Sequence, residues 1–157
     1  MSPDLPVPPV AENTRRRIDL TKIGDGRFKA TNARGGVLPI GSGGDPDFTP
    51  VELLLAAIAG CSAIDVDLIT RKRADAVVLD VRAEGTKVRD EHGNHLTGLQ
   101  LTFDVRFPEG EGGDKARGVL TSAIEKSRDR LCTVGRTVQV GAPILYTEGE
   151  ISPSSPS

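Results

Sequence analysis

The sequence predicts an α+β fold with an antiparallel sheet and two main helices. Two observations carry this prediction: paired segments in which apolar and polar residues alternate strictly, and two long segments whose apolar residues recur at helical spacing. Strands and helices do not alternate as regular βαβ units, which favours an antiparallel sheet. At 157 residues, 37% of them hydrophobic, the chain has the size of one globular domain, placed at residues 15–150. Residues 1–14 are expected to form a flexible arm and residues 151–157 a disordered tail.

A first hairpin is predicted near the N-terminus. The segments RRRIDLTKI and RFKAT, between Arg15 and Thr31, flank Gly24-Asp25-Gly26, a turn signal typical of a hairpin. The Gly-rich stretch that follows, residues 35–44, contains neither G-x-G-x-x-G nor a Gly-Lys-Ser/Thr phosphate motif. We interpret this stretch as a connecting loop and not as a nucleotide site.

The first helix has a distinct start. Thr49 suits the N-cap, Pro50 suits the first helical position, and Glu52 lies three residues after Thr49, as in a capping box. The helix should run to about residue 74, where the basic residues 71–73 complement the negative end of its dipole.

The second half of the chain predicts a longer hairpin and more helix. Residues 79–84 and 99–107 alternate with period 2, and the turn-rich residues 90–95 between them indicate an antiparallel pair. Apolar residues at helical spacing predict a second helix over about residues 114–130. We expect another short helix to begin after Cys132, and Pro143 to Tyr146 to form a last strand.

Composition excludes several classes of partner. The net charge is −2 with acids and bases interspersed, so the chain lacks the basic surface that nucleic acid requires. The proline-rich start has no apolar core of a secretory signal. The longest apolar run, Val51 to Ile64, is shorter than the roughly 20 residues of a membrane helix. From Val51 to Ala59 the helix is apolar on nearly every side, as in a helix surrounded by protein. We therefore expect a cytoplasmic protein with neither nucleic-acid nor membrane partners.

The candidate chemistry rests on two cysteines. Two are too few for a disulfide scaffold, and their wide separation lacks the C-x-x-C spacing of zinc ribbons. Cys61 lies in a helix between small residues, and on that observation alone burial as a small hydrophobic residue is favoured over reactivity. Cys132 follows one helix and opens another, where free amide groups stabilise a thiolate. Its basic neighbours, Arg128, Arg130 and Arg136, act in the same direction. A cysteine at the boundary of two elements also fits simple packing, and the sequence leaves both interpretations open.

Other polar residues are interpreted as structural. Glu52 lies nine residues from Cys61 on the same helix and cannot touch it, so the capping role is favoured. The H-x-x-H pair at residues 92 and 95 falls in a polar turn without further ligands at zinc spacing. Asp65 and Asp67 point to different sides of the helix and are taken to mark where it reaches solvent. We predict no cofactor and no metal site.

Two segments carry a family resemblance. The string TPVELLLAAIAGCSAIDV, Thr49 to Val66, resembles the central-helix signature of the OsmC/Ohr family, and SRDRLC, Ser127 to Cys132, resembles its second-cysteine segment. Element order and spacing agree from about residue 15 to residue 150. The segment GCSAIDV is more similar to a less characterised OsmC-like branch of the family.

The resemblance implies an intertwined homodimer with long central helices packed together and active sites at the subunit interface. It implies a peroxide-reducing Cys61 and a resolving Cys132 that together reduce organic hydroperoxides, with an external dithiol as reductant. Family peroxidases also use an arginine, for which Arg34 is the candidate ahead of Arg27, and a glutamate where this chain has Val51. Two alternatives therefore stay open: a non-catalytic or ligand-binding OsmC-like protein, and a thiol redox switch.

Overall fold

The computed structural model describes residues 14–153 and confirms the α+β class. The chain divides into two compact units, Met1–Leu54 and Leu55–Ser157. Each unit has one antiparallel sheet, with three strands in the first and two in the second among the described residues. The predicted N-terminal arm, apart from Thr14, and residues 154–157 of the predicted tail lie outside the described residues. One domain over residues 15–150 stays a prediction.

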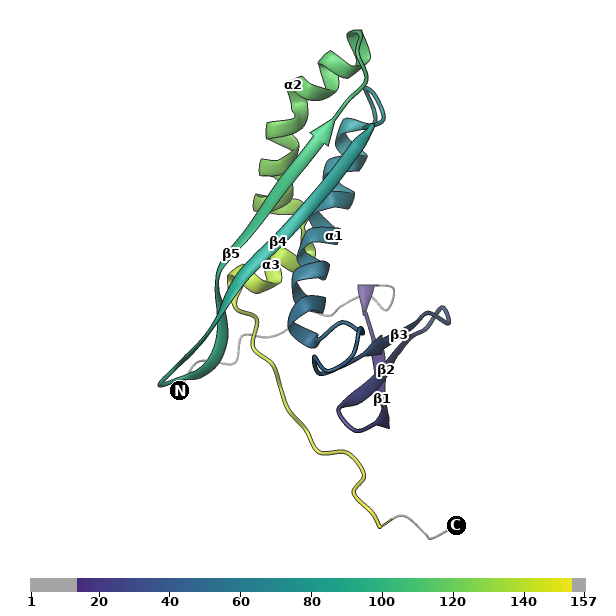
Figure 1. Cartoon of the computed structure of the whole chain (residues 1–157), viewed down its shortest axis with the longest axis vertical. Coiled ribbons are helices and arrows are strands. Elements are labelled where there is room, and N and C mark those ends of the chain that lie inside the picture. The colour runs from purple at the N-terminus through teal and green to yellow at the C-terminus, as the bar shows by residue number, and fades with distance from the viewer. Residues whose placement is uncertain (1–13, 154–157) are drawn as a thin grey trace. The chain divides into compact units, whose positions relative to one another are not determined.

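The first unit is a small sheet with strand order β1-β2-β3 (Figure 1). Strands β1 (Ile18–Gly24) and β2 (Arg27–Asn32) form the predicted hairpin around Gly26, whose positive φ of 64° suits glycine. Strand β3 (Val37–Ile40) is not predicted from the sequence, because it lies in the Gly-rich stretch interpreted as a loop. Pro39 is tolerated in β3 because the strand is at the edge of the sheet.

Helix α1 (Pro50–Thr70) begins where the sequence predicts. The Thr49 hydroxyl oxygen accepts the backbone N–H of Glu52 at 3.3 Å and donates to the Glu52 carboxylate at 2.8 Å, so the capping roles are confirmed. The helix ends at Thr70, before the predicted residue 74. There Arg73 leaves the helix and donates to the Ile69 carbonyl at 3.1 Å, which satisfies one of the free carbonyls of the helix end.

The second unit contains a long two-stranded hairpin, β4 (Val78–Asp90) and β5 (Gly93–Arg106). The predicted alternation is confirmed and extends further than predicted, with an irregularity in register between Glu84 and Thr86. The turn closes where the Asp90 carboxylate accepts the His92 backbone N–H at 2.8 Å. The helices of this unit thus pack along the β4–β5 hairpin (Figure 1).

Three helical segments follow the hairpin: α2 (Glu111–Lys126), the π-helical turn η2 (Ser127–Leu131) and α3 (Thr133–Val140). The predicted second helix and the short helix after Cys132 are both present. Small residues of α2, Ala116 and Ala123, are fully buried, as is Val66 of α1. The buried apolar residues of this unit are therefore mostly aliphatic, with Phe107 as the buried aromatic residue among those described.

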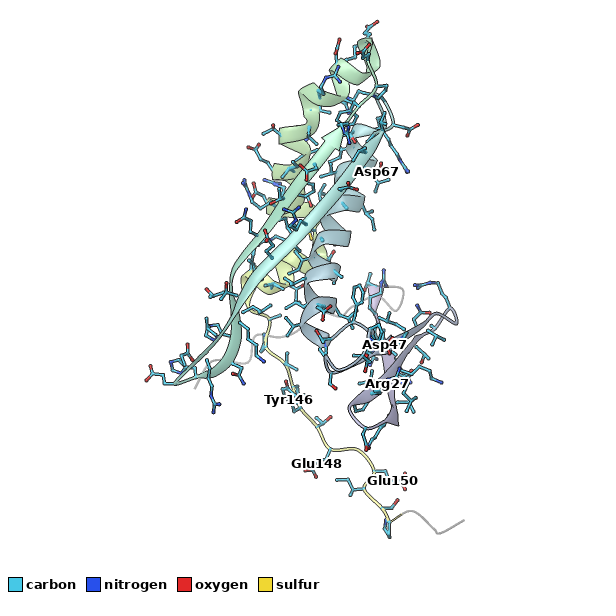
Figure 2. All side chains as sticks on the ribbon, in the orientation of Figure 1. Arg27, Asp47, Asp67, Tyr146, Glu148 and Glu150 are labelled. Carbon is cyan, nitrogen blue, oxygen red and sulfur yellow. The ribbon has the colours of Figure 1, made fainter. Side chains whose placement is uncertain are left out.

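The predicted last strand is wrong. Residues 143–146 form neither helix nor strand, and the Ile144, Leu145 and Tyr146 side chains are exposed (Figure 2 labels Tyr146). An extended segment becomes a strand only when another strand supplies its hydrogen bonds, and apolar content alone does not provide that partner.

The length argument against a membrane-spanning segment does not hold. Helix α1 is 21 residues long, and its most apolar window has a mean hydropathy of 1.9, enough in length and composition to cross a bilayer. The core helices of water-soluble proteins have the same properties, so this observation assigns α1 to neither class.

Candidate functional site

The two cysteines lie together in the second unit. The Cys61 sulfur, the Cys132 sulfur and a carboxylate oxygen of Asp65 are all within 4.8 Å of one another. Both thiols are free. Cys61 and Cys132 come from distant parts of the sequence, and the packing of α1 against the junction of η2 and α3 brings them together.

Helix α1 presents two members of this cluster. Cys61 and Asp65 are four residues apart, so they lie on one face of the helix, one turn from each other. Both side chains are partly buried, whereas the neighbouring Ser62 and Val66 are buried. Asp65 therefore does not only mark where the helix reaches solvent, as the sequence suggested, but also lies beside the two sulfurs. Asp67 does face outward, where it pairs with Arg71 at 3.5 Å (Figure 2).

The junction of α2 and α3 presents the third member. The chain widens into the π-helical turn η2, in which the Cys132 backbone N–H donates to the Ser127 carbonyl at 2.9 Å. Cys132 is then the N-cap of α3, and its sulfur accepts the Gly135 backbone N–H at 3.2 Å. The predicted helix start at Cys132 is confirmed, with an amide donor aimed at the sulfur.

Ser127 links the two elements. Its hydroxyl donates to the Asp65 carboxylate at 2.9 Å, and the serine is only 1% exposed. This bond fixes one carboxylate oxygen of Asp65 beside the sulfurs. In the sequence, Ser127 stands out only as the first residue of the SRDRLC segment, although the i,i+4 spacing of Cys61 and Asp65 was a usable signal that a carboxylate lies near the thiol.

The electrostatics of the cluster favour the neutral thiol of Cys61. Burial raises the pKa of Cys61, and the nearby Cys132 and Asp65 add to this rise. A backbone hydrogen bond from Val134, in the first turn of α3, opposes these effects but does not outweigh them. Cys61 therefore holds its proton more firmly than an ordinary cysteine.

The candidate arginines are occupied elsewhere or lie in the first unit. Arg128 forms an ion pair with Asp129 at 2.6 Å, and Arg136 donates to Gln139 at 2.9 Å. In the first unit, Arg27 pairs with Asp47 at 2.6 Å (Figure 2). Arg34 lies in the turn between β2 and β3, where its backbone N–H donates to the Asn32 side chain at 3.0 Å. Activation of Cys61 by Arg34 stays a prediction.

A cavity of about 380 Å³ adjoins the cluster. Cys132 forms part of its wall, together with apolar side chains from α1, the β4–β5 hairpin and α2, including Ile58, Phe103 and Ile124. Its size is at the lower end of the range for small-molecule sites, and its lining is largely apolar. The Cys132 thiol therefore lies at the edge of a cavity that suits an apolar group.

A family model and several known proteins match most of this chain. A family model described as OsmC-like protein matches residues 42–146. Protein YhfA of Escherichia coli K12 is 30% identical over 112 residues, which cover 71% of this chain and 79% of YhfA. An uncharacterized protein of Mycobacterium tuberculosis is 29% identical over 125 residues, which cover 78% of this chain and 88% of that protein.

Solved structures show the same fold. An OsmC-like protein of unknown function from Vibrio cholerae matches with a TM-score of 0.66 at 15% identity, over 80% of this chain and 94% of that one. A hypothetical protein from Aquifex aeolicus matches with a TM-score of 0.64 at 22% identity, over 80% of this chain and 88% of that one.

Proposed function

The chain belongs to the family of OsmC-like proteins, and from this premise we propose that it is a cysteine-based peroxidase acting on organic hydroperoxides. The observation that carries the proposal is the proximity of the Cys61 and Cys132 sulfurs, which lie within 4.8 Å of each other. A two-cysteine peroxidase needs two free thiols close together, because the resolving sulfur must reach the sulfenic sulfur to form the disulfide.

The proposed reaction has three balanced steps. The Cys61 thiolate attacks one oxygen of the O–O bond, which breaks to leave a sulfenic acid and an alkoxide that takes up a proton as the alcohol. The Cys132 thiol then attacks the sulfenic sulfur, so that a disulfide forms and water leaves. An external dithiol restores both thiols by exchange and is itself oxidised to a disulfide.

The environments of the two thiols support this order. Cys61 is partly exposed, whereas Cys132 is only 1% exposed, so the peroxide reaches Cys61 more easily. We propose that the organic part of the hydroperoxide lies in the adjoining cavity against Ile58 and Phe103; Cys132 lines this cavity, and the Cys61 sulfur lies within 4.8 Å of the Cys132 sulfur. We place the protein in the reducing cytoplasm, where dithiols are available to complete the cycle.

A homodimer is part of the proposal. Within the second unit, Ile64 and Leu68 of α1 are 62% and 43% exposed and lie four residues apart, on one side of the helix. We propose that a second copy of the chain covers this apolar stripe. Light scattering after gel filtration should give twice the chain mass of 16.6 kDa, and Ile64→Lys should reduce it to one chain. A single-chain mass for the unmodified protein would contradict the dimer.

The activity test uses the reduced full chain with cumene hydroperoxide and a dithiol. We expect one alcohol formed and two protein thiols lost per peroxide when the dithiol is omitted, and repeated turnover when it is present. Cys61→Ser should show neither the stoichiometric reaction nor the repeated turnover. If the protein formed no disulfide and consumed no peroxide, the peroxidase proposal would be wrong.

One observation favours a second candidate function, a thiol redox switch. The raised pKa of Cys61, caused first by burial, slows attack on peroxide at neutral pH. In a switch the disulfide forms once and is the signal. The same assay separates the two functions, since a switch loses two thiols stoichiometrically but shows no sustained turnover with dithiol.

A further inference from the structure

The cysteine cluster also has the composition of a metal site. Its members offer two sulfurs and one carboxylate oxygen within 4.8 Å of one another. Ligands about 2.0 to 2.3 Å from one tetrahedral zinc ion lie roughly 3.5 to 3.8 Å apart, so about 1 Å of side-chain adjustment closes the cluster around an ion. The sequence alone did not indicate this site, because its two cysteines lie far apart in the chain and lack zinc-ribbon spacing.

The groups around the ligands are arranged as in supported metal sites. The buried Ser127 hydroxyl donates to Oδ2 of Asp65, which orients the carboxylate and leaves its other oxygen available. The Gly135 N–H donates to the Cys132 sulfur, and the Val134 backbone bonds to Cys61. Gly135 permits this approach, because a Cβ there would lie 3.1 Å from the Cys132 sulfur. Each ligand therefore has a supporting hydrogen bond from the η2–α3 junction.

Charge supports a cation at this place. Two thiolates and a carboxylate repel one another when all are ionised, and a divalent cation reverses that repulsion. The basic side chain that lines the adjoining cavity, Arg128, is paired with Asp129. Because Asp129 neutralises the charge of Arg128, that arginine offers little positive charge to the cluster. A cation bound between Cys61, Asp65 and Cys132 would supply it.

From this geometry we infer a zinc site formed by Cys61, Asp65 and Cys132. Thiolate ligands favour zinc over magnesium or calcium, and the carboxylate favours zinc over copper(I). Three protein ligands leave the fourth tetrahedral position to water or a small ligand. The supporting Ser127 acts through Asp65 as a positioning residue.

Zinc binding and disulfide formation exclude each other, because both use the same two sulfurs. An organic hydroperoxide and two protons would convert the zinc-bound dithiolate into a disulfide, with release of one alcohol, one water and the Zn²⁺ ion. This release step rests on the proposed function, whereas zinc binding itself does not. The site would thus couple release of the metal ion to oxidation of the cysteine pair by peroxide.

The test is titration of the reduced, metal-free full chain with Co²⁺ as a spectroscopic probe, followed by displacement with Zn²⁺. We expect one Co²⁺ per chain with thiolate-to-cobalt absorption bands and the visible bands of a tetrahedral ion. Cys61→Ser and Cys132→Ser should each lose the charge-transfer intensity, and Asp65→Asn should weaken binding at least about tenfold. Ser127→Ala should weaken it less, with the same spectrum.

Asp67→Asn is the matched control, since Asp67 lies two residues away on the same helix and pairs with Arg71 outside the cluster. Circular dichroism confirms that each variant is folded. Equal affinity in Asp65→Asn and Asp67→Asn, or unchanged spectra in the serine variants, would overturn the site. Peroxide turnover measured on zinc-free protein is a separate readout, so a failure of the peroxidase proposal and a failure of the zinc site are distinguishable.

Discussion

Cys61 lies in the middle of a regular 21-residue helix, whereas Cys132 lies where α2 widens into a π-helical turn and α3 begins. The helix offers Cys61 a flanking carboxylate one turn away, at Asp65. The junction offers Cys132 an amide donor, from Gly135 at 3.2 Å. The two sulfurs are therefore close in space but have different local partners. Helical periodicity places Asp65 beside Cys61, whereas the break in the helix at η2 places the Gly135 amide beside Cys132.

This difference indicates a division of roles. The α1 residue is partly exposed and adjoins a negative group, while the junction residue is buried and fixed by backbone hydrogen bonds. A residue held by the backbone keeps its position when its partner sulfur changes oxidation state. This difference supports the proposed order, in which peroxide reacts first at Cys61 and Cys132 resolves the sulfenic acid.

The largest expected effect separates these roles directly. Cys61→Ser should abolish peroxide consumption, whereas Cys132→Ser should still consume one peroxide per chain and stop at a Cys61 sulfenic acid. The physical reason is that the second thiol is needed only to form the disulfide. Mass spectrometry after dimedone labelling measures the trapped sulfenic acid. If Cys132→Ser were as inert as Cys61→Ser, the two roles would be wrong or shared.

The same contrast explains what the sequence could predict. The start of α1 was predictable because Thr49, Pro50 and Glu52 are local capping signals, and the long hairpin because alternation is a local pattern. Proximity of Cys61 and Cys132 followed from resemblance alone. The contact of Asp65 with Ser127 was not predictable, because it depends on how the π-helical turn rotates the chain between α2 and α3.

A smaller effect compares the packing of the two regions. Val66, one turn from Ser62 on α1, has no exposed surface, whereas Leu131 at the end of η2 is 48% exposed. Val66→Ala should lower the free energy of unfolding by about 2 to 3 kcal/mol, because it leaves a cavity in a close-packed core. Leu131→Ala should cost less than about 1 kcal/mol. Urea unfolding of the reduced proteins measures both.

Equal losses in these two variants would contradict the packing difference and show that the junction carries as much of the stability as the buried face of α1. A loss confined to Val66→Ala would show that the η2 turn owes its position to hydrogen bonds, chiefly those of Ser127, more than to apolar burial.

The smallest expected effect concerns the charge beside Cys61. Burial, with Cys132 and Asp65 in support, raises the pKa of Cys61, so less of it is thiolate at neutral pH than of an ordinary cysteine. Its alkylation rate, followed by mass spectrometry at that residue, should therefore keep rising with pH beyond the midpoint of an unperturbed thiol. Asp65→Asn removes a negative charge, lowers the pKa and should raise the rate at pH 7 a few-fold.

Asp67→Asn provides the comparison, because that carboxylate pairs with Arg71 and is not part of the cluster. It should leave the pH profile of Cys61 alkylation unchanged. A profile for the unmodified protein with its midpoint below that of an ordinary thiol would mean that the α3 amides, or a positive group from a second chain, outweigh burial. In that case Cys61, and not Cys132, would be the thiol whose surroundings favour the thiolate.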